Sequence, residues 1–275
     1  MNLFNLKHKI YLLLILFGSY YSWCQNSTVH LELKRTINIP EGTSATFLDG
    51  QQNVYFVNKD EISKYSNYAT PIKQSIKKWQ SIDDIESINS LKIAVFSKSQ
   101  QQLCFLDNTL SENGNCINLD ELGLLNVAAL ATSKRADMLW MYDELNSSLV
   151  LFNFVTKKEI QRVDNLQGIL GISGEITLNE NEYGLWISSS DGKICLMDDF
   201  MNVVRCASET NQAMIPYADG FFFVNENRLY YRDLFEGVNE VYKIFTTENI
   251  RELYMSGNQL IARTSSELNV FIIQP

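Results

Sequence analysis

The feature that most constrains this chain of 275 residues is a repeat of short apolar runs with a mean spacing of about 41 residues. The six runs are Val54–Val57, Ile93–Phe96, Leu139–Tyr142, Leu185–Ile187, Phe221–Val224 and Leu260–Ala262. A second run follows each start after roughly eight to ten residues, the spacing of consecutive short strands. Several short strands per unit at this period are typical of β-propeller blades.

The unit is clearest between Tyr183 and Cys206. There an apolar run ends in the turn Asp191-Gly192, a second run closes on Asp198-Asp199, and a third begins at Val203. Asp-Gly supplies the positive φ of a tight hairpin, so the stretch predicts three antiparallel strands.

Six units account for the chain from His30 to its end, but the last unit stops after its third strand. The alternating segment from His30 to Ile39 has no unit of its own. We therefore predict a six-bladed, all-β propeller in which this segment pairs with Leu268–Ile273 and closes the last blade. Seven blades with one degenerate blade near Trp79–Ser90, and a pair of β-sandwiches, are the alternatives.

Residues 1–24 have the pattern of an export signal. Lys7 and Lys9 precede an apolar run over Ile10–Phe17, and small residues stand before Gln25. We predict cleavage there and a single mature domain over residues 25–275. Acylation of Cys24, as in a lipoprotein, is the alternative. The apolar run is too short to span a bilayer, so we expect no membrane span in the mature chain.

Removal of the leader leaves 21 basic and 32 acidic residues, a net charge of −11. This charge disfavours nucleic acid, whose binding depends on neutralising phosphates, and also disfavours anionic membranes. The charge is typical of an exported protein that is kept soluble by its acidic surface.

Four cysteines follow the leader, and each pair brackets the hairpin between the third and fourth strands of a unit. We predict disulfides between Cys104 and Cys116 and between Cys195 and Cys206, which indicates an oxidising compartment. The other two connectivities and a zinc site are alternatives, although the chain has no Cys-x-x-Cys pair.

Catalytic residues are scarce. The mature chain has one histidine, His30, so histidine-dependent chemistry lacks its usual residue, and no glycine motif for phosphates precedes a helix. We expect no cofactor and no enzyme activity. The alternative is a calcium-dependent six-bladed hydrolase or lactonase, whose carboxylates would come from Asp49, Asp137, Glu175 and Asp219.

Three aromatic residues are candidates for contacting a protein partner. Trp79 lies in a polar connection where an exposed tryptophan would be a binding hot spot, and a packed loop anchor is the alternative. Tyr230 and Tyr231 are adjacent on a strand, so they lie on opposite sides of it.

The segment Leu185–Ile194 resembles the Leu-Trp-Ile-Gly-Thr-x-x-Gly-Leu repeat of two-component-regulator-type propellers, with Ser188-Ser189 in place of Gly-Thr. Ile88–Phe96, Gln102–Leu110 and Leu139–Glu144 are similar to segments of exported propeller proteins of Bacteroidota. Some of those proteins attach to the type IX secretion machinery. The resemblance implies a non-catalytic binding or scaffold module, in the periplasm or at the outer membrane, with an outer-membrane translocon as partner.

Overall fold

The computed structural model describes residues 30–66, 70–76, 79–209, 213–226, 228–235, 239–242 and 249–274. The chain divides into two compact units, and the larger one spans Leu31–Gln274. The smaller unit comprises residues 1–30 and Pro275, and the leader predicted over residues 1–24 lies outside the described residues.

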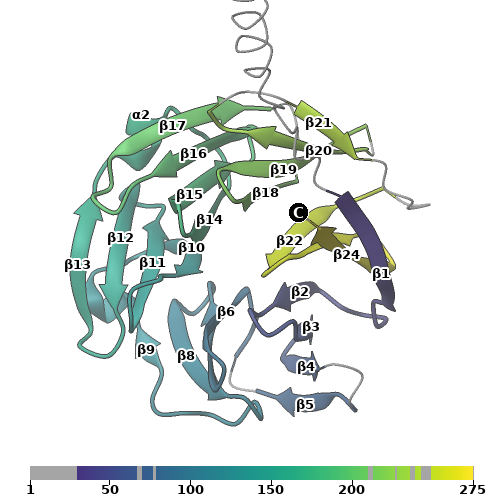
Figure 1. Cartoon of the computed structure of the whole chain (residues 1–275). Coiled ribbons are helices and arrows are strands. Elements are labelled where there is room, and N and C mark those ends of the chain that lie inside the picture. Colours follow the sequence, from purple (N-terminus) through teal and green to yellow (C-terminus); the bar gives the residue numbers. More distant parts are fainter. Residues whose placement is uncertain are drawn as a thin grey trace, which may run out of the picture. The chain divides into compact units, whose positions relative to one another are not determined.

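The larger unit consists of six four-stranded antiparallel sheets, arranged as the blades of a propeller (Figure 1). Blade 1 comprises β2 (Ala45–Leu48), β3 (Val54–Asn58), β4 (Glu61–Tyr65) and β5 (Ile72–Ser75). Blade 2 comprises β6 (Asp84–Asn89), β7 (Lys92–Ser97), β8 (Gln102–Asp107) and β9 (Ile117–Asn118). Blade 3 comprises β10 (Val127–Thr132), β11 (Met138–Asp143), β12 (Ser148–Asn153) and β13 (Lys158–Val163).

Blade 4 comprises β14 (Ile176–Asn181), β15 (Gly184–Ser189), β16 (Lys193–Met197) and β17 (Val203–Ser208). Blade 5 comprises β18 (Met214–Tyr217), β19 (Gly220–Asn225), β20 (Arg228–Asp233) and β21 (Asn239–Tyr242). Blade 6 comprises β22 (Glu252–Ser256), β23 (Gln259–Arg263), β24 (Glu267–Gln274) and β1 (His30–Asn38). Two short helices of the described chain, η1 (Asp120–Leu122) and α2 (Leu166–Leu170), lie in the connections that follow blades 2 and 3.

The predicted closure of the ring is confirmed, because β1 pairs with β24 as the outer strand of blade 6. Ile39 N donates to Ser266 O over 2.8 Å, and Thr36 Oγ1 donates to Asn269 Oδ1 over 2.8 Å. The first strand of the described chain thus completes the sheet that the last three strands leave unfinished.

The six repeated runs prove to be the second strands of the six blades, where both faces of the sheet are covered by neighbouring blades. Trp140 and Trp186, for example, are 1% exposed. Strands buried on both faces read as continuous apolar runs, which is why the repeat was visible in the sequence.

Both predicted disulfides are present, Cys104–Cys116 and Cys195–Cys206, with Cα atoms 4.2 and 4.1 Å apart. Cys195 and Cys206 are direct partners in the register of β16 and β17. Each bridge therefore joins the third strand of a blade to its outer edge. Two disulfides fit a protein of an oxidising compartment.

The antiparallel strand order places the loops of every blade at two opposite ends. Turns between strands one and two, and between strands three and four, lie at one end, here called face A. Turns between strands two and three, together with the connections between blades, lie at the other end, called face B. Within the described ranges, no helix has the length and apolarity needed to cross a bilayer.

Candidate functional site

The exposed large apolar side chains of the described residues fall into three groups. Five lie at the tips of face A turns, three lie on face B around blade 3, and five lie on outer strands. The face A group consists of Leu91, Val155, Tyr183, Phe200 and Phe235, which are 44% to 81% exposed. Face A therefore concentrates aromatic and aliphatic side chains at positions fixed by turns.

One local device places all five of these side chains. An Asn or Asp ends the preceding strand or begins the turn, and its Oδ1 accepts a hydrogen bond from the main-chain N–H two residues later. The donor–acceptor distances lie between 2.7 and 3.1 Å for the pairs Leu91 N to Asn89, Val155 N to Asn153, Tyr183 N to Asn181, Phe200 N to Asp198 and Phe235 N to Asp233. Blades 1 and 2 use the same turn to present Gln51 and Thr109.

The turn that carries Phe200 is held by further hydrogen bonds. Asp198 Oδ1 also accepts a hydrogen bond from Asn202 N over 2.8 Å, and Asp198 Oδ2 accepts one from Asn202 Nδ2 over 3.1 Å. These hydrogen bonds, the one from the Asn202 side chain foremost, hold the pKa of Asp198 below its ordinary value. Met201, next to Phe200, turns inward and is 9% exposed. The turn thus buries one neighbour and leaves Phe200 81% exposed.

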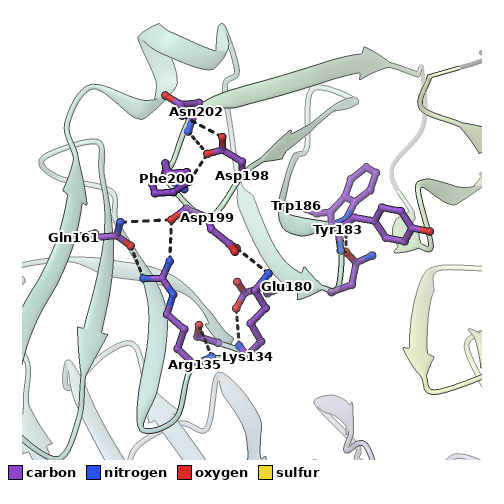
Figure 2. Close-up of polar contacts among 12 residues, drawn as sticks. Lys134, Arg135, Gln161, Glu180, Tyr183, Trp186, Asp198, Asp199, Phe200 and Asn202 are labelled. Atoms are coloured by element: carbon purple, nitrogen blue, oxygen red, sulfur yellow. Dashed lines mark hydrogen bonds and ion pairs between the residues drawn. The ribbon is translucent and has the colours of Figure 1, made fainter.

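Blade 3 anchors the same turn from the side (Figure 2). Lys134 Nζ lies 2.7 Å from Asp199 Oδ1, and Arg135 Nη2 donates to the carbonyl oxygen of Asp199 over 2.8 Å. Arg135 Nη1 is held in turn by Gln161 Oε1 at 2.8 Å. An exposed aromatic ring on a backbone fixed from two blades loses little conformational entropy when a partner covers it.

Further contacts join neighbouring blades near face A. Lys64 Nζ donates to Asn108 O over 3.1 Å, and Lys92 Nζ lies 4.9 Å from the ring centroid of Phe154. Asn181 Nδ2 donates to Ala218 O over 3.0 Å, and Ser256 Oγ donates to Asp49 O over 2.7 Å. Among the described residues, these contacts connect the face A loops of neighbouring blades.

A cavity of about 540 Å³ is lined by the first strands of all six blades. Asp84 and Glu86 lie on its wall at the contact between blades 2 and 3, where Glu86 Oε2 accepts hydrogen bonds from Thr132 N at 2.8 Å and Thr132 Oγ1 at 2.7 Å. Desolvation raises the pKa of Asp84 well above its ordinary value, and the nearby Glu86 raises it further. Desolvation also raises the pKa of Glu86.

The structure does not bring together the four carboxylates of the predicted calcium alternative. Asp49, Asp137 and Asp219 follow the first strands of blades 1, 3 and 5 on face A, whereas Glu175 precedes β14 at the other end. In the described part of the chain, no three Asp, Glu, His or Cys residues are grouped as metal ligands.

The carboxylate of Asp49 illustrates the local role of these residues. Its Oδ1 accepts hydrogen bonds from Gln51 N and Asn53 N, and its Oδ2 accepts from Asn53 Nδ2 and Tyr55 Oη, all between 2.6 and 2.9 Å. Asp49 is 4% exposed. It therefore stabilises the β2–β3 turn.

Of the two positions open for Trp79, the structure shows the buried one, so its use as an exposed partner-binding residue is wrong. Trp79 is 3% exposed and packs in an apolar cluster that includes Ile76 and Ile82, because the connection folds back against blades 1 and 2. This arrangement matches the alternative of a packed loop anchor.

Tyr230 and Tyr231 lie on opposite sides of β20, as predicted. The Tyr230 ring stacks on Phe223 at 5.1 Å, and Tyr231 Oη donates to Asp219 Oδ1 over 3.1 Å. Burial raises the pKa of Tyr231, and the nearby Asp219 raises it further. Both rings are half-buried within blade 5, and neither stands at a turn tip.

Fold and surface together define the class: this chain is a β-propeller of six blades, and the described turns of one face carry exposed apolar side chains. No protein-family model matches it, and no curated protein is a significant match. Solved structures resemble it in fold alone, because their sequences have little in common with this one.

Three of them illustrate the likeness. A chain of the mitotic checkpoint complex matches with a TM-score of 0.60 and 11% identity over 91% of this chain and 94% of its own. The Cps50 (Swd1) β-propeller domain of Myceliophteria thermophila matches with a TM-score of 0.61 and 10% identity, over 89% of this chain and 100% of its own. Virginiamycin B lyase from Staphylococcus aureus matches with a TM-score of 0.58 and 9% identity, over 86% of this chain and 82% of its own.

Proposed function

We propose that this chain is an exported, non-catalytic scaffold that binds a protein partner through face A. The observation that carries the proposal is the set of five apolar side chains held outward by Asx turns on that face. Apolar side chains on a pre-organised backbone are the usual anchors of a protein interface.

Phe200 is the central anchor of this interface. Its turn is fixed by its own hydrogen bonds and by Lys134 and Arg135 of the next blade. A partner that buries this ring gains the apolar area without having to order the loop. Val155 and Phe235 occupy the equivalent turns of the adjacent blades 3 and 5 and extend the contact on either side.

The fold likeness supports the same class of function, because one of the similar structures belongs to a multi-protein assembly, the mitotic checkpoint complex. The finer proposal is that the partner is a component of the outer-membrane protein transport machinery, such as the type IX translocon. It is supported by the sequence resemblance described above and by the two disulfides, which fit the periplasm or the outer-membrane surface.

The proposal is tested by capture from the native envelope in mild detergent, followed by mass spectrometry. The tagged wild-type protein is compared with a Val155→Ser/Phe200→Ser/Phe235→Ser variant. The control is Leu33→Ser/Ile72→Ser/Ile160→Ser, which changes three exposed apolar residues on outer strands.

We expect the wild type and the control to recover a stoichiometric partner. The amount of that partner recovered with the face A variant should be lower by about tenfold or more. Equal recovery with both variants would contradict binding through face A. All six residues are exposed, so neither variant should change stability by more than about 0.5 kcal/mol per site.

The cavity lined by the first strands of the six blades, called the axial cavity here, favours a second candidate, the calcium-dependent hydrolase or lactonase. Its wall includes Asp84, Glu86 and Glu175, but no three acidic residues of the described chain are grouped as metal ligands, so calcium would bind through one or two of these carboxylates together with water. Thermal unfolding with millimolar calcium and with a chelator separates the candidates. A rise in Tm with calcium that is abolished by Glu86→Gln would favour the enzyme. An unchanged Tm would favour the protein-binding scaffold.

A further inference from the structure

Face B carries an apolar patch of its own around blade 3. Leu125, Leu145 and Ile169 are 51%, 66% and 52% exposed, and together they are the exposed large apolar residues on face B within the described chain. Leu125 lies between η1 and β10, Leu145 lies in the β11–β12 turn, and Ile169 lies in α2. We name these three residues the blade-3 patch.

Main-chain hydrogen bonds hold the three segments side by side. Glu144 N donates to Asn126 O over 2.9 Å, which places the residue after Leu125 against the residue before Leu145. Leu166 N donates to Ser147 O over 2.7 Å, and Gln167 N donates to Ser147 Oγ over 3.1 Å, which fixes the start of α2 against the same turn. The blade-3 patch is therefore a built surface rather than three unrelated side chains.

The charge around this patch has one sign. Residues 119–126, 143–148 and 164–172 are all described, and they contain five acidic residues and no Lys, Arg or His. Asp143 is buried, and the other four, Asp120, Glu121, Glu144 and Asp164, are exposed.

Three basic residues lie beside these segments. Lys98 is in the β7–β8 turn, where its carbonyl oxygen accepts a hydrogen bond from Gln101 Nε2. The side chains of the other two are already engaged. Arg162 pairs with Glu159 and reaches Asp164 at 3.6 Å. Lys193 Nζ donates to Gly171 O over 3.4 Å. Glu121 and Glu144 accept hydrogen bonds from Asn118 and Asn126 and have no cation partner among the described residues. An apolar centre framed by unneutralised carboxylates is complementary to apolar side chains flanked by cations.

We propose that the blade-3 patch binds an amphipathic segment of a partner protein that presents apolar side chains together with Lys or Arg. Anionic membranes carry the same sign of charge as the four carboxylates and are repelled by them. A second copy of this chain has a net charge of −9, so two copies repel each other overall. This surface is at the opposite end of the blade from face A, so the propeller has two separate binding faces.

The probe is a short amphipathic peptide of Leu and Lys, with a scrambled peptide of the same composition and a Leu/Glu peptide for comparison. Binding to the full mature protein is measured by isothermal titration calorimetry at low and at physiological salt. We expect the amphipathic Leu/Lys peptide to bind more tightly than the scrambled one, and the Leu/Glu peptide not to bind.

Two variants then locate the site. Leu145→Ser/Ile169→Ser should weaken binding about tenfold or more, and Glu121→Gln/Glu144→Gln should weaken binding and reduce its salt dependence. The matched controls are Leu91→Ser and Glu41→Gln/Glu182→Gln. Leu91 lies on face A and is 64% exposed, close to the 66% of Leu145. Both controls should bind as the wild type does.

The proposal is overturned if the scrambled peptide binds equally, because attraction would then depend on net charge alone. It is also overturned if the amphipathic peptide does not bind the wild-type protein, or if the patch variants bind as tightly as their controls. Capture through face A can succeed or fail independently, since none of the variants at the blade-3 patch changes a face A residue.

Discussion

Lys134 Nζ of blade 3 lies 2.7 Å from Asp199 Oδ1 of blade 4, directly beside the turn that presents Phe200. The contact links two blades at the point where the most exposed aromatic side chain of the described propeller leaves the surface. A backbone held in place beneath an exposed ring lowers the entropy cost of binding a partner through that ring.

Asp198→Ala should loosen the Phe200 turn without unfolding the propeller. The substitution removes the acceptor for Phe200 N and for Asn202 N and Nδ2. Hydrogen exchange should become faster at the Phe200 and Asn202 amides and stay unchanged in β15 and β16. Asp107→Ala, the equivalent change in blade 2, should leave those two amides as in the wild type. Unchanged exchange at Phe200 would mean that Asp198 does not order the turn.

Removal of β1 should open blade 6. Deletion of residues 25–38 exposes the edge of β24, and we expect Tm to fall by about 10 °C or more and aggregation to increase. An unchanged Tm would disprove ring closure by β1.

A single substitution tests the same pairing more gently. Thr36→Val removes the donor to Asn269 Oδ1, which is buried at 4% exposure, and should cost about 1 to 2 kcal/mol in urea unfolding. A Thr36→Ser variant keeps the hydroxyl and should retain most of that stability.

The two disulfides should contribute separately to stability. Cys104→Ser/Cys116→Ser and Cys195→Ser/Cys206→Ser each open a loop of 12 or 11 residues and should each cost about 2 to 3 kcal/mol. Denaturant midpoints of the variants and of the wild type, with and without reductant, provide the measurement. If reductant leaves the wild-type midpoint unchanged, the bridges do not stabilise the blades.

The axial carboxylates should make stability fall as pH rises. Desolvation raises the folded-state pKa of Asp84 above its ordinary value of 3.8, with Glu86 and Asp83 as the charges that raise it further. The folded state then binds more protons than the unfolded state from about pH 3.8 up to the raised pKa, so the contribution of Asp84 declines across that window and stays unfavourable above it.

Asp84→Asn removes this contribution and can still accept the hydrogen bond from Ile85 N. The variant should therefore gain stability over the wild type as pH rises, as measured by urea midpoints between about pH 4 and pH 8. A constant difference between the two proteins across that range would refute the assignment.

The fold could be predicted because each blade has a second strand buried on both faces, so its apolar run stands out. Strands such as β5 and β9 are short and polar, and the periodicity of the sequence did not reveal them. The disulfides could be predicted because the cysteines bracket equivalent hairpins in blades 2 and 4.

The candidate site was harder to predict. The polar neighbours of Trp79 in the sequence left an exposed and a packed position open, and tertiary packing of the connection buries it. The pattern of Asx followed two residues later by an apolar residue was present at Asp198 and Phe200, and its meaning depends on knowing that the turn directs that position outward. The blade-3 patch joins three segments that are well separated in the sequence, and only the fold brings them together.

The most direct test of the binding face is photo-crosslinking in the native cell from a reactive amino acid at position 200, compared with positions 72 and 160 on the outer strands. We predict that position 200 yields a single dominant crosslinked protein, and that Asp198→Ala or Arg135→Ala reduces its yield. Crosslinks that are equally diverse from all three positions would contradict the account of face A as a pre-organised protein-binding surface.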